Sequence, residues 1–472
     1  MQSSPGEFRQ RIDEALANAR VRRNFRSAMD GLMARRLDQF PDREELERLR
    51  TQGLEIRAHA LRNLPGLLER LEARCSANGI QVHWAETALD ANRIVLGIMR
   101  RHDARMIIKG KSMVSEEMGL NAFLAEQGIE ALESDLGEFI LQLAHEPPSH
   151  IVAPAIHKDR YQVAELFREK FPHIPYSDDI DQLTQNARQL LRDKFRTAPV
   201  GLSGVNFAVA ETGTLCLVEN EGNGRMSTTA PAVHIAVTGI EKVVECLADI
   251  PPLLTLLTRS ATGQPITTYF NMISGPRKLH EKDGPHEVHL VLLDNGRSTI
   301  YGDPELQATL RCIRCGACMN HCPVYTRISG HAYGTVYPGP IGIVLEPQKE
   351  GLDAIGELTS ASTLCGACGE VCPVRIPLPN LINRLRFDAV RADGKGARGH
   401  GSRRHAGEAL IWRGWALVHA HPAVYRLGTW LAAWLRHWVP RRLGAWTRSR
   451  AAPRLAERSL HRLARQQGFD HE

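Results

Sequence analysis

One cysteine-rich segment occurs twice in this chain. The first copy, residues 312–324, reads CIRCGACMNHCPV, and the second, residues 362–374, reads STLCGACGEVCPV. Two cysteines and the Cys-Pro pair match between the copies, but Cys312 of the first stands opposite Ser362 of the second. The first copy is a complete C-x2-C-x2-C-x3-C-P run, the spacing with which bacterial ferredoxins bind iron–sulfur clusters. The duplication therefore predicts two clusters and a chain that carries electrons.

The spacing also predicts which cysteines share a cluster. Three thiolates two residues apart wrap one cubane, whereas the fourth, in front of a proline turn, reaches the other cluster. We therefore expect crossed ligand sets, namely Cys312, Cys315, Cys318 and Cys372 for the first [4Fe–4S] cluster and Cys322, Cys365 and Cys368 for the second. The second cluster has only three thiolates. Its fourth iron could be bound by the Ser362 oxygen, by water or by a ligand from a partner. If nothing binds it, oxidation leaves a [3Fe–4S] core.

Other uses of these cysteines fit the sequence less well. Four cysteines from 312 to 322 crowd a zinc site, whose ligands must converge as a tetrahedron. A disulfide framework belongs to small secreted proteins, and the start MQSSPGEFRQ lacks the basic and apolar segments of a signal peptide. No apolar run approaches the ~20 residues that cross a bilayer, so we expect a cytoplasmic protein. The remaining Cys75, Cys216 and Cys246 are expected to be small buried hydrophobes.

Outside the cysteine segments, the pattern predicts helices first and an α/β domain after them. Residues 1–100 carry leucine and alanine at helical spacing. Beyond them, buried strands are predicted at RMIIKG, SHIVAPAI and HEVHLVLLDNG, a hairpin at FAVAETGTLCLVEN, and a strand leading into a helix at HIAVTGIEKVVECL. Strands that alternate with helices favour a mostly parallel sheet covered by helices. Helices are also expected on both sides of the cysteine loops, at ELQATLRCIRC and PNLINRLRFDAVRAD.

Three domains follow from these patterns. We place the α/β domain with its N-terminal helices at 1–300, an α-helical two-cluster ferredoxin-type domain at 301–392, and an Arg/Trp-rich helical tail at 393–472. The tail explains the net charge of +6, because residues 397–472 hold fourteen Arg, no Lys and four acids. Its G-x-G-x-x-G at residues 394–399 follows a predicted helix and precedes a Gly/Arg linker, so we interpret it as a chance match.

Two polar segments of the α/β domain follow predicted strands. Residues 107–120 contain Lys109, Lys111 and Ser112, and the glycine-containing loop at 218–231 contains Glu219, Glu221 and Arg225. The strand ends of open α/β sheets are the usual ligand position, and helix N-termini favour anions. A pocket is therefore predicted, with polar turn residues at sheet ends as the alternative. No nucleophile–base pair or further metal-ligand set identifies a reaction, and the catalytic residues stay unknown.

Three separated stretches together resemble a known family. They begin KGKSMVSEEMGLNAFLAEQGIEALESD, GVNFAVAETGTLCLVENEGNGR and RCGACMNHCPVYTRISGHAYGTVYPGPIG. They are similar to the LUD-domain iron–sulfur protein family, that of lactate utilisation protein B, over roughly residues 50–470 and in domain order. The resemblance implies a LUD domain with a ribose-5-phosphate isomerase/CoA-transferase-like fold and two [4Fe–4S] clusters. It also implies a role in oxidising L-lactate to pyruvate, together with a second LUD protein and a cysteine-rich protein with CCG domains.

Three functions follow from these features. The leading hypothesis is an electron-transfer subunit of a multi-protein L-lactate-oxidising system, non-catalytic or co-catalytic, with an unidentified electron acceptor. The second is a LUD-domain enzyme that acts on a small anionic substrate with the clusters in support. The third is a redox-responsive regulator whose basic tail binds nucleic acid. Two cross-ligated clusters make a relay, whereas a sensor needs only one, and no recognised nucleic-acid motif accompanies the arginines, so no nucleic acid is expected.

The tail carries six of the seven tryptophans. At helical spacing, one arc holds six residues of the tail, with Pro440 as the expected end of the helix: Leu427, Trp430, Leu431, Trp434, Leu435 and Trp438. Three interpretations stay open for this stripe: docking onto the rest of the protein, binding of a partner, and peripheral attachment to a membrane surface.

Overall fold

The computed structural model describes residues 7–391, 406–438, 440, 442, 444–447, 451–452 and 454–469. Its described residues form two compact units, one within residues 7–389 and one in the C-terminal tail. No helix among the described residues is long and apolar enough to span a membrane. The glycine motif at 394–399 lies outside the described residues.

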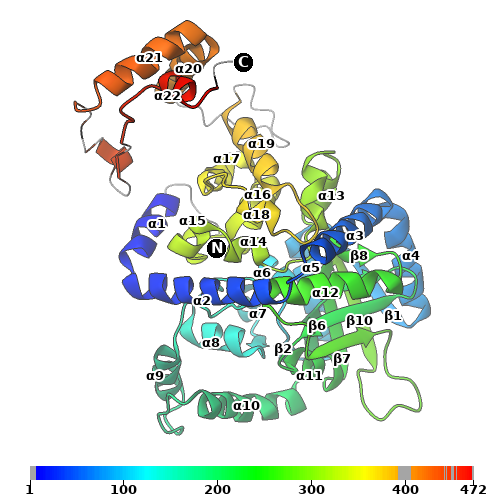
Figure 1. Cartoon of the computed structure of the whole chain (residues 1–472). Coiled ribbons are helices and arrows are strands. Elements are labelled where there is room, and N and C mark those ends of the chain that lie inside the picture. The colour runs from blue at the N-terminus through cyan, green and yellow to red at the C-terminus, as the bar shows by residue number, and fades with distance from the viewer. Residues whose placement is uncertain are drawn as a thin grey trace. The chain divides into compact units, whose positions relative to one another are not determined.

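A six-stranded parallel sheet organises the first unit (Figure 1). Its strand order is β1-β10-β7-β4-β2-β3, and the predicted parallel sheet is thereby confirmed. The strands are β1 (Ile80–Ala85), β2 (Met106–Lys109), β3 (Glu130–Glu133), β4 (Val200–Gly204), β7 (Val233–Gly239) and β10 (Glu287–Leu293). The central β7 is buried at every position, as expected for a strand covered on both faces.

Helices connect these strands. They are α5 (Ala88–Arg101), α6 (Met113–Glu117), α7 (Leu120–Glu126), α8 (Leu136–Ala144), α9 (Arg160–Lys170), α10 (Ile180–Thr197) and α11 (Asn223–Thr229). One buried cluster packs α5–α7 against the sheet, and another contains residues of α8, α9 and α10 with Ile108 of β2. The helix α5 begins at a capping box in which Thr87 and Asp90 satisfy each other's backbone N–H groups.

A second, four-stranded sheet has the order β8-β5-β6-β9. Its strands are β5 (Phe207–Val209), β6 (Thr214–Glu219), β8 (Val243–Val244) and β9 (Tyr269–Ile273). The predicted hairpin is confirmed, since β5 and β6 pair antiparallel around Thr212–Gly213. It shares one large core with the N-terminal helices α1 (Glu7–Ala17), α2 (Ala19–Asp38), α3 (Arg43–Arg62) and α4 (Leu64–Ala77).

Four of the expected elements differ in the structure. Residues 1–100 include the strand β1, and SHIVAPAI forms bends and turns where we expected a strand. After β7, the chain makes the short turns η1 (Ile240–Lys242) and η2 (Leu247–Asp249) before the helix α12 (Ile250–Ala261), so a helix does not follow directly. ELQATLRCIRC forms only a 3-10 turn, η3 (Leu306–Arg311), after the short helix α13 (Arg297–Tyr301).

The two-cluster segment is helical, as predicted. Its elements are α14 (Ala317–Asn320), α15 (Pro323–Ile328), η4 (His331–Tyr333), α16 (Gly339–Glu350), α17 (Leu352–Ile355), η5 (Gly356–Ser360), α18 (Ala367–Glu370) and α19 (Leu378–Val390). Its buried side chains belong to the same core as the second sheet and the N-terminal helices. The cysteine loops are therefore packed against the α/β domain.

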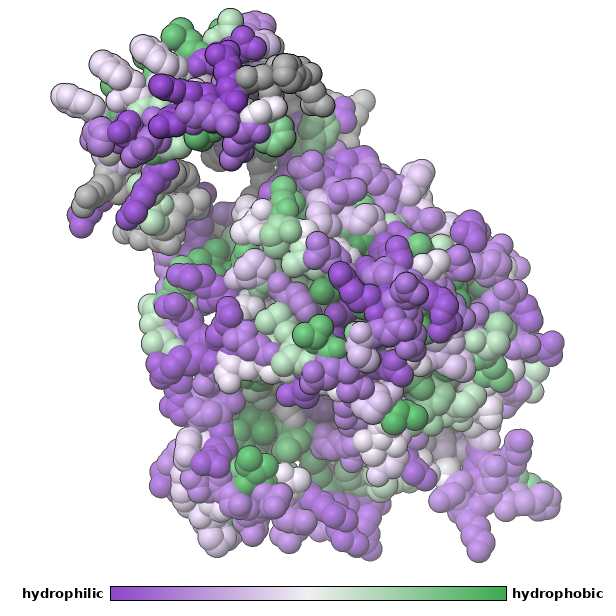
Figure 2. All heavy atoms as spheres, in the orientation of Figure 1, coloured by the Kyte–Doolittle hydropathy of each residue, from purple (hydrophilic) through white to green (hydrophobic). Residues whose placement is uncertain are grey.

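The tail unit contains α20 (Ala406–Ala420), α21 (Pro422–Trp434), η6 (Gly444–Thr447) and α22 (Leu460–Gln466). The predicted helix ends at Trp434, before Leu435 and Trp438, so the expected end at Pro440 is wrong. None of the residues of α20 and α21 is buried, and Trp434 is 68% exposed. Figure 2 shows hydrophobic patches among the hydrophilic side chains of this unit. What the stripe binds stays a prediction.

A buried ion network joins the sheet to the two-cluster segment. Arg297, at the start of α13, is 1% exposed and binds Glu117 at 2.8 and 2.9 Å and Glu241 at 2.5 Å. Lys349 of α16 adds a contact of 3.1 Å to Glu117. Burial opposes ionisation of Glu241, yet Arg297 and then Arg314 lower its pKa to about 2.

We expect Arg297→Met to lower the free energy of unfolding by about 3–5 kcal/mol, because Glu117 and Glu241 remain buried without their shared cation. The control is Arg26→Met, which removes an exposed pair with Asp30 and should cost less than about 1 kcal/mol. Urea denaturation at neutral pH measures both. Since the pKa of Glu241 is depressed, its contribution is present above the ordinary carboxyl pKa and disappears as the pH falls towards 2. Equal losses in the two variants would contradict this.

Candidate functional site

The two cysteine loops have the same backbone. Arg314 and Leu364 occupy equivalent positions and are both left-handed, with φ of 61° and 54°. Gly316 and Gly366 follow, with φ of 76° and 88°, and each lies at the start of a short helix, α14 or α18. A left-handed turn is costly for a side chain other than glycine, so its recurrence in both copies shows that the sequence repeat is also a structural repeat.

Ser362 takes the place of Cys312 in the second loop. The Arg314 N–H donates to Cys312 Sγ at 3.4 Å, and the equivalent Leu364 N–H donates to Ser362 Oγ at 3.1 Å. The hydroxyl oxygen thus receives the backbone hydrogen bond that the thiol receives in the first copy. The second loop keeps the geometry of the first and loses one soft ligand atom.

The thiols of the first predicted ligand set lie close together. Burial, followed by the charges of Cys312 and Cys372, raises the pKa of Cys315 to about 12. Burial and the charge of Cys312 likewise raise the pKa of Cys372 to about 11. Burial raises the pKa of Cys318 well above its usual value. The charges of these three neighbours, and that of Cys368 from the other set, add to the rise. The four thiols come from both loops, as the crossed arrangement requires.

The second predicted set is also brought together. Burial raises the pKa of Cys368 to about 12, and the charges of Cys322 and Cys365 contribute to the rise. Burial also raises the pKa of Cys322, and the charge of Cys365 adds to that rise. The role of all seven thiols as ligands stays a prediction. Of the other cysteines, Cys75 and Cys216 are buried as expected, whereas Cys246 is only half-buried, and that expectation was wrong for it.

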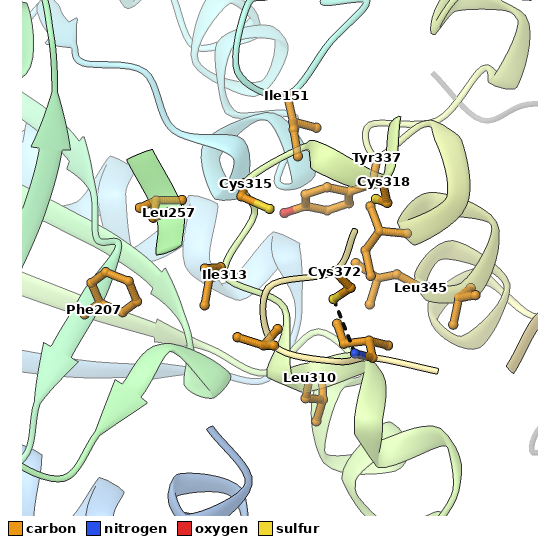
Figure 3. Close-up of a cluster of buried hydrophobic side chains, with 14 of the residues drawn as sticks. Ile151, Phe207, Leu257, Leu310, Ile313, Cys315, Cys318, Tyr337, Leu345 and Cys372 are labelled. Atoms are coloured by element: carbon orange, nitrogen blue, oxygen red, sulfur yellow. Dashed lines mark hydrogen bonds between the residues drawn. The ribbon is translucent and has the colours of Figure 1, made fainter. Parts of the chain in front are cut away.

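The two sets differ in their exposure. Cys315, Cys318 and Cys372 are all buried and belong to the large core, where Figure 3 shows them among side chains such as Ile313 and Leu345. Cys365 is exposed, and the neighbouring Leu364 is 40% exposed. A cluster in the first position would lie inside the protein, and one in the second would reach its surface.

Arg57 of α3 places a buried positive charge beside the first loop. It is 1% exposed, and its guanidinium donates to four backbone carbonyl oxygens: those of Glu241, Val243, Leu310 and Arg311. Two of these belong to η3, directly before Cys312. Among the described residues, no carboxylate oxygen lies within 4.0 Å of this guanidinium.

Lys242 and Arg36 repeat this arrangement. The Lys242 ammonium, 7% exposed, donates to the Cys312 carbonyl oxygen at 3.3 Å, and burial together with the charge of Arg314 lowers its pKa to about 7. Arg36, 8% exposed, donates to the Val371 carbonyl oxygen beside Cys372 at 3.4 Å. Neither has a carboxylate partner within the described part of the chain. A buried cation needs a compensating anion, and a thiolate-bound iron–sulfur cluster is net anionic. The residues around the first loop therefore fit such a cluster.

A pocket of about 360 Å³ opens at the carboxyl end of the parallel sheet. Ser112, Asn206 and Lys242, which follow β2, β4 and β7 in the chain, belong to its lining. The first cysteine loop supplies Arg314, which contacts Glu241 at 3.4 Å and lies 4.6 Å from the centre of the Tyr337 ring. Ile151, Leu257 and Tyr337 of the lining are drawn with Cys315 in Figure 3 as parts of one buried cluster. The pocket thus adjoins the loop that contains three of the predicted ligands of the first cluster.

Most of the polar residues predicted for a pocket line this one. Four of them belong to the lining: Lys111, Ser112, Glu219 and Glu221. The two segments that we predicted to follow strands therefore meet at this pocket. Lys109 does not, because it is fully buried and pairs with Glu133. Arg225 also lies outside the lining and is placed over the Tyr269 ring.

Four residues of the site were not predicted from the sequence: Arg57, Lys242, Arg314 and Tyr337. Lys242 falls in a segment that we predicted to be a helix. Arg314 gave one usable signal, since a charged residue between two predicted ligands must lie close to the cluster.

Three families match the chain in succession. The LUD domain matches residues 68–293, the 4Fe-4S dicluster domain matches residues 308–376, and the C-terminal family of lactate utilisation protein B matches residues 384–469. A crystal structure of a DUF162 family protein from Deinococcus radiodurans is 16% identical, with a TM-score of 0.29, over 49% of this chain and 98% of that chain. That likeness is too weak to support an argument.

Full-length relatives are much more similar. Lactate utilization protein B of Lysinibacillus sphaericus is 43% identical over 92% of this chain and 89% of its own. The protein of the same name from Bacillus subtilis is 41% identical over 89% and 86%. An uncharacterized electron transport protein of Escherichia coli, YkgF, is 41% identical over 96% of this chain and 95% of its own. The chain therefore belongs to the lactate utilization protein B family.

Proposed function

We propose that this protein is the iron–sulfur electron-transfer subunit of a multi-protein system that oxidises L-lactate to pyruvate. A role in lactate utilisation with iron–sulfur electron transfer is supported by the names of its relatives and by the dicluster domain. The observation that carries the proposal is the contrast between two matching cysteine loops, one buried beside the pocket and one that exposes Cys365. This arrangement suits a relay from the interior to the surface.

The first cluster is assigned to four thiols from both loops: Cys312, Cys315, Cys318 and Cys372. The second is assigned to Cys322, Cys365 and Cys368, with Ser362 beside its fourth iron. Bound clusters supply one-electron chemistry. The chain's own residues hold the thiols in position through backbone hydrogen bonds, such as Ile376 N–H to Cys372 Sγ at 3.3 Å, and place Arg57 and Lys242 against the anionic group.

The finer parts of the proposal concern architecture and partners. The domains are divided near residues 300 and 392, and the LUD domain has a ribose-5-phosphate isomerase/CoA-transferase-like fold. The partners are a second LUD protein, a protein with CCG domains and an electron acceptor that docks near Cys365. Peripheral membrane contact through the tail is consistent with its exposed tryptophans.

A second candidate function is catalysis by the LUD domain on a small anionic substrate, with the clusters in support. The pocket favours it, because its polar residues converge at the usual ligand position of such a sheet.

Cys315→Ser should remove about half of the bound iron and sulfide from protein purified without oxygen, because one of two clusters loses a thiolate. Cys246→Ser is the matched control, since Cys246 lies outside both loops, and it should keep the full content. Iron and acid-labile sulfide analyses measure both. Unchanged content in Cys315→Ser would rule out the assignment.

The second cluster should be the oxygen-sensitive one, because a hydroxyl binds iron far more weakly than a thiolate does. Brief exposure to air should produce a [3Fe–4S] EPR signal in the wild type, and Ser362→Cys should suppress it. Ser360→Cys, two residues away, should not, because Ser360 Oγ donates to the Glu357 carbonyl oxygen instead. If the two variants give the same [3Fe–4S] EPR signal after exposure to air, the position of Ser362 has no chemical consequence for the cluster.

The purified chain should be reduced by dithionite yet should not oxidise L-lactate on its own, because no acid–base set or flavin site accompanies the clusters in the sequence. An anaerobic assay with an artificial electron acceptor tests this, with the partner proteins added as the positive control. Sustained turnover by the single polypeptide would favour the LUD-domain enzyme instead.

A further inference from the structure

The pocket beside the first cysteine loop contains cations that have capacity for a further anion. The Lys242 ammonium has three donors and makes one hydrogen bond, to the Cys312 carbonyl oxygen, among the described residues. The Arg314 guanidinium has five donors, and Glu241 accepts from it at 3.4 Å while pairing more closely with Arg297 at 2.5 Å. Both cations lie on the side of the pocket formed by η1 and the cysteine loop.

Apart from Glu241, which contacts Arg314, the acidic residues of the lining have partners other than these two cations. Glu219 accepts from the Gly224 and Arg225 N–H groups, both at 2.6 Å, and from the Asn271 amide at 2.8 Å. Glu221 accepts from the Leu136 N–H at 3.2 Å. Lys111 has its own partner, Glu138, at 3.2 Å. Glu219 and Glu221 therefore stabilise the loops around the pocket and leave Lys242 without a carboxylate.

Part of the remaining lining is apolar, beside polar side chains such as Ser203, Asn206 and Thr258. Six buried aliphatic side chains form this apolar part: Val114, Ile151, Val205, Leu217, Leu257 and Ala261. A volume of about 360 Å³ lies at the small end of the range for ligand sites, and it leaves room beyond a three-carbon acid. The preferred ligand should thus combine an anionic head with an apolar chain.

Resting on the proposed role in lactate utilisation, we infer that this pocket binds a 2-hydroxycarboxylate, with the carboxylate at Lys242 and Arg314 and the carbon chain against Leu257. We expect the site to admit longer 2-hydroxy acids as well as lactate, because its volume leaves room beyond a three-carbon acid and part of its lining is apolar. A ligand held there lies against the loop that contains Cys312 and Cys315.

Calorimetric titration of the cluster-loaded protein, kept without oxygen, tests this with L-lactate and with L-2-hydroxyisocaproate. Both should bind, and the longer acid should bind at least as tightly. Lys242→Met should weaken both by about tenfold to a hundredfold, the range expected for a lost charged hydrogen bond. Leu257→Phe leaves every charge in place and should weaken the longer acid more than L-lactate.

Lys194→Met is the control for loss of a lysine, because Lys194 is exposed and pairs with Glu130 on the surface; it should bind as the wild type does. Iron analysis of each variant separates the two proposals. If the clusters load and are reduced but neither acid binds, or if Lys242→Met and Leu257→Phe both bind unchanged, the inference is wrong and the electron-transfer function stands. If the wild type holds no clusters, the proposed function itself fails.

Discussion

Compensation of buried charge around the first cysteine loop is the constraint on which the rest of the structure depends. A guanidinium or ammonium inside a protein costs several kcal/mol unless an anion or a full set of acceptors surrounds it. Arg57 has acceptors but no carboxylate, and Lys242 has a single carbonyl oxygen. Because these acceptors belong to η1, β8, η3 and Cys312, the second sheet and the cysteine loop must be positioned together for either cation to be stable.

The two cysteine loops share a backbone and differ in their surroundings. The reduction potential of a cluster depends on net charge, on hydrogen bonds to sulfur and on solvent exposure. The first loop is buried among cations, whereas the second exposes Cys365 and has Ser362 in place of a thiol. Two clusters with the same core structure would therefore acquire different potentials, which a directional relay needs.

Sequence alone predicted the features that depend on local pattern. The cysteine repeat, the parallel sheet and the hairpin at Thr212–Gly213 were read from spacing, apolar runs and turn residues. SHIVAPAI was misread, because side chains replace a strand ladder there: His150 Nδ1 accepts from the N–H groups of Val152 and Ala153. The segment after β7 was misread as a helix because Glu241 and Lys242 look like surface residues, and only their distant partners Arg297 and Cys312 explain their burial.

The pocket could not be predicted in full, since its walls come from segments far apart in the chain, and this arrangement has an electrostatic consequence. An anion at Lys242 and Arg314 would share its cations with the first cluster. Coupling between two sites is reciprocal, so a bound carboxylate would oppose reduction of that cluster, and reduction would weaken the hold on the carboxylate. Passing the electron on towards the exposed second loop would restore the cations' affinity for the next anion. Binding at the pocket and transfer between the proposed clusters would thus be linked through the same few buried side chains.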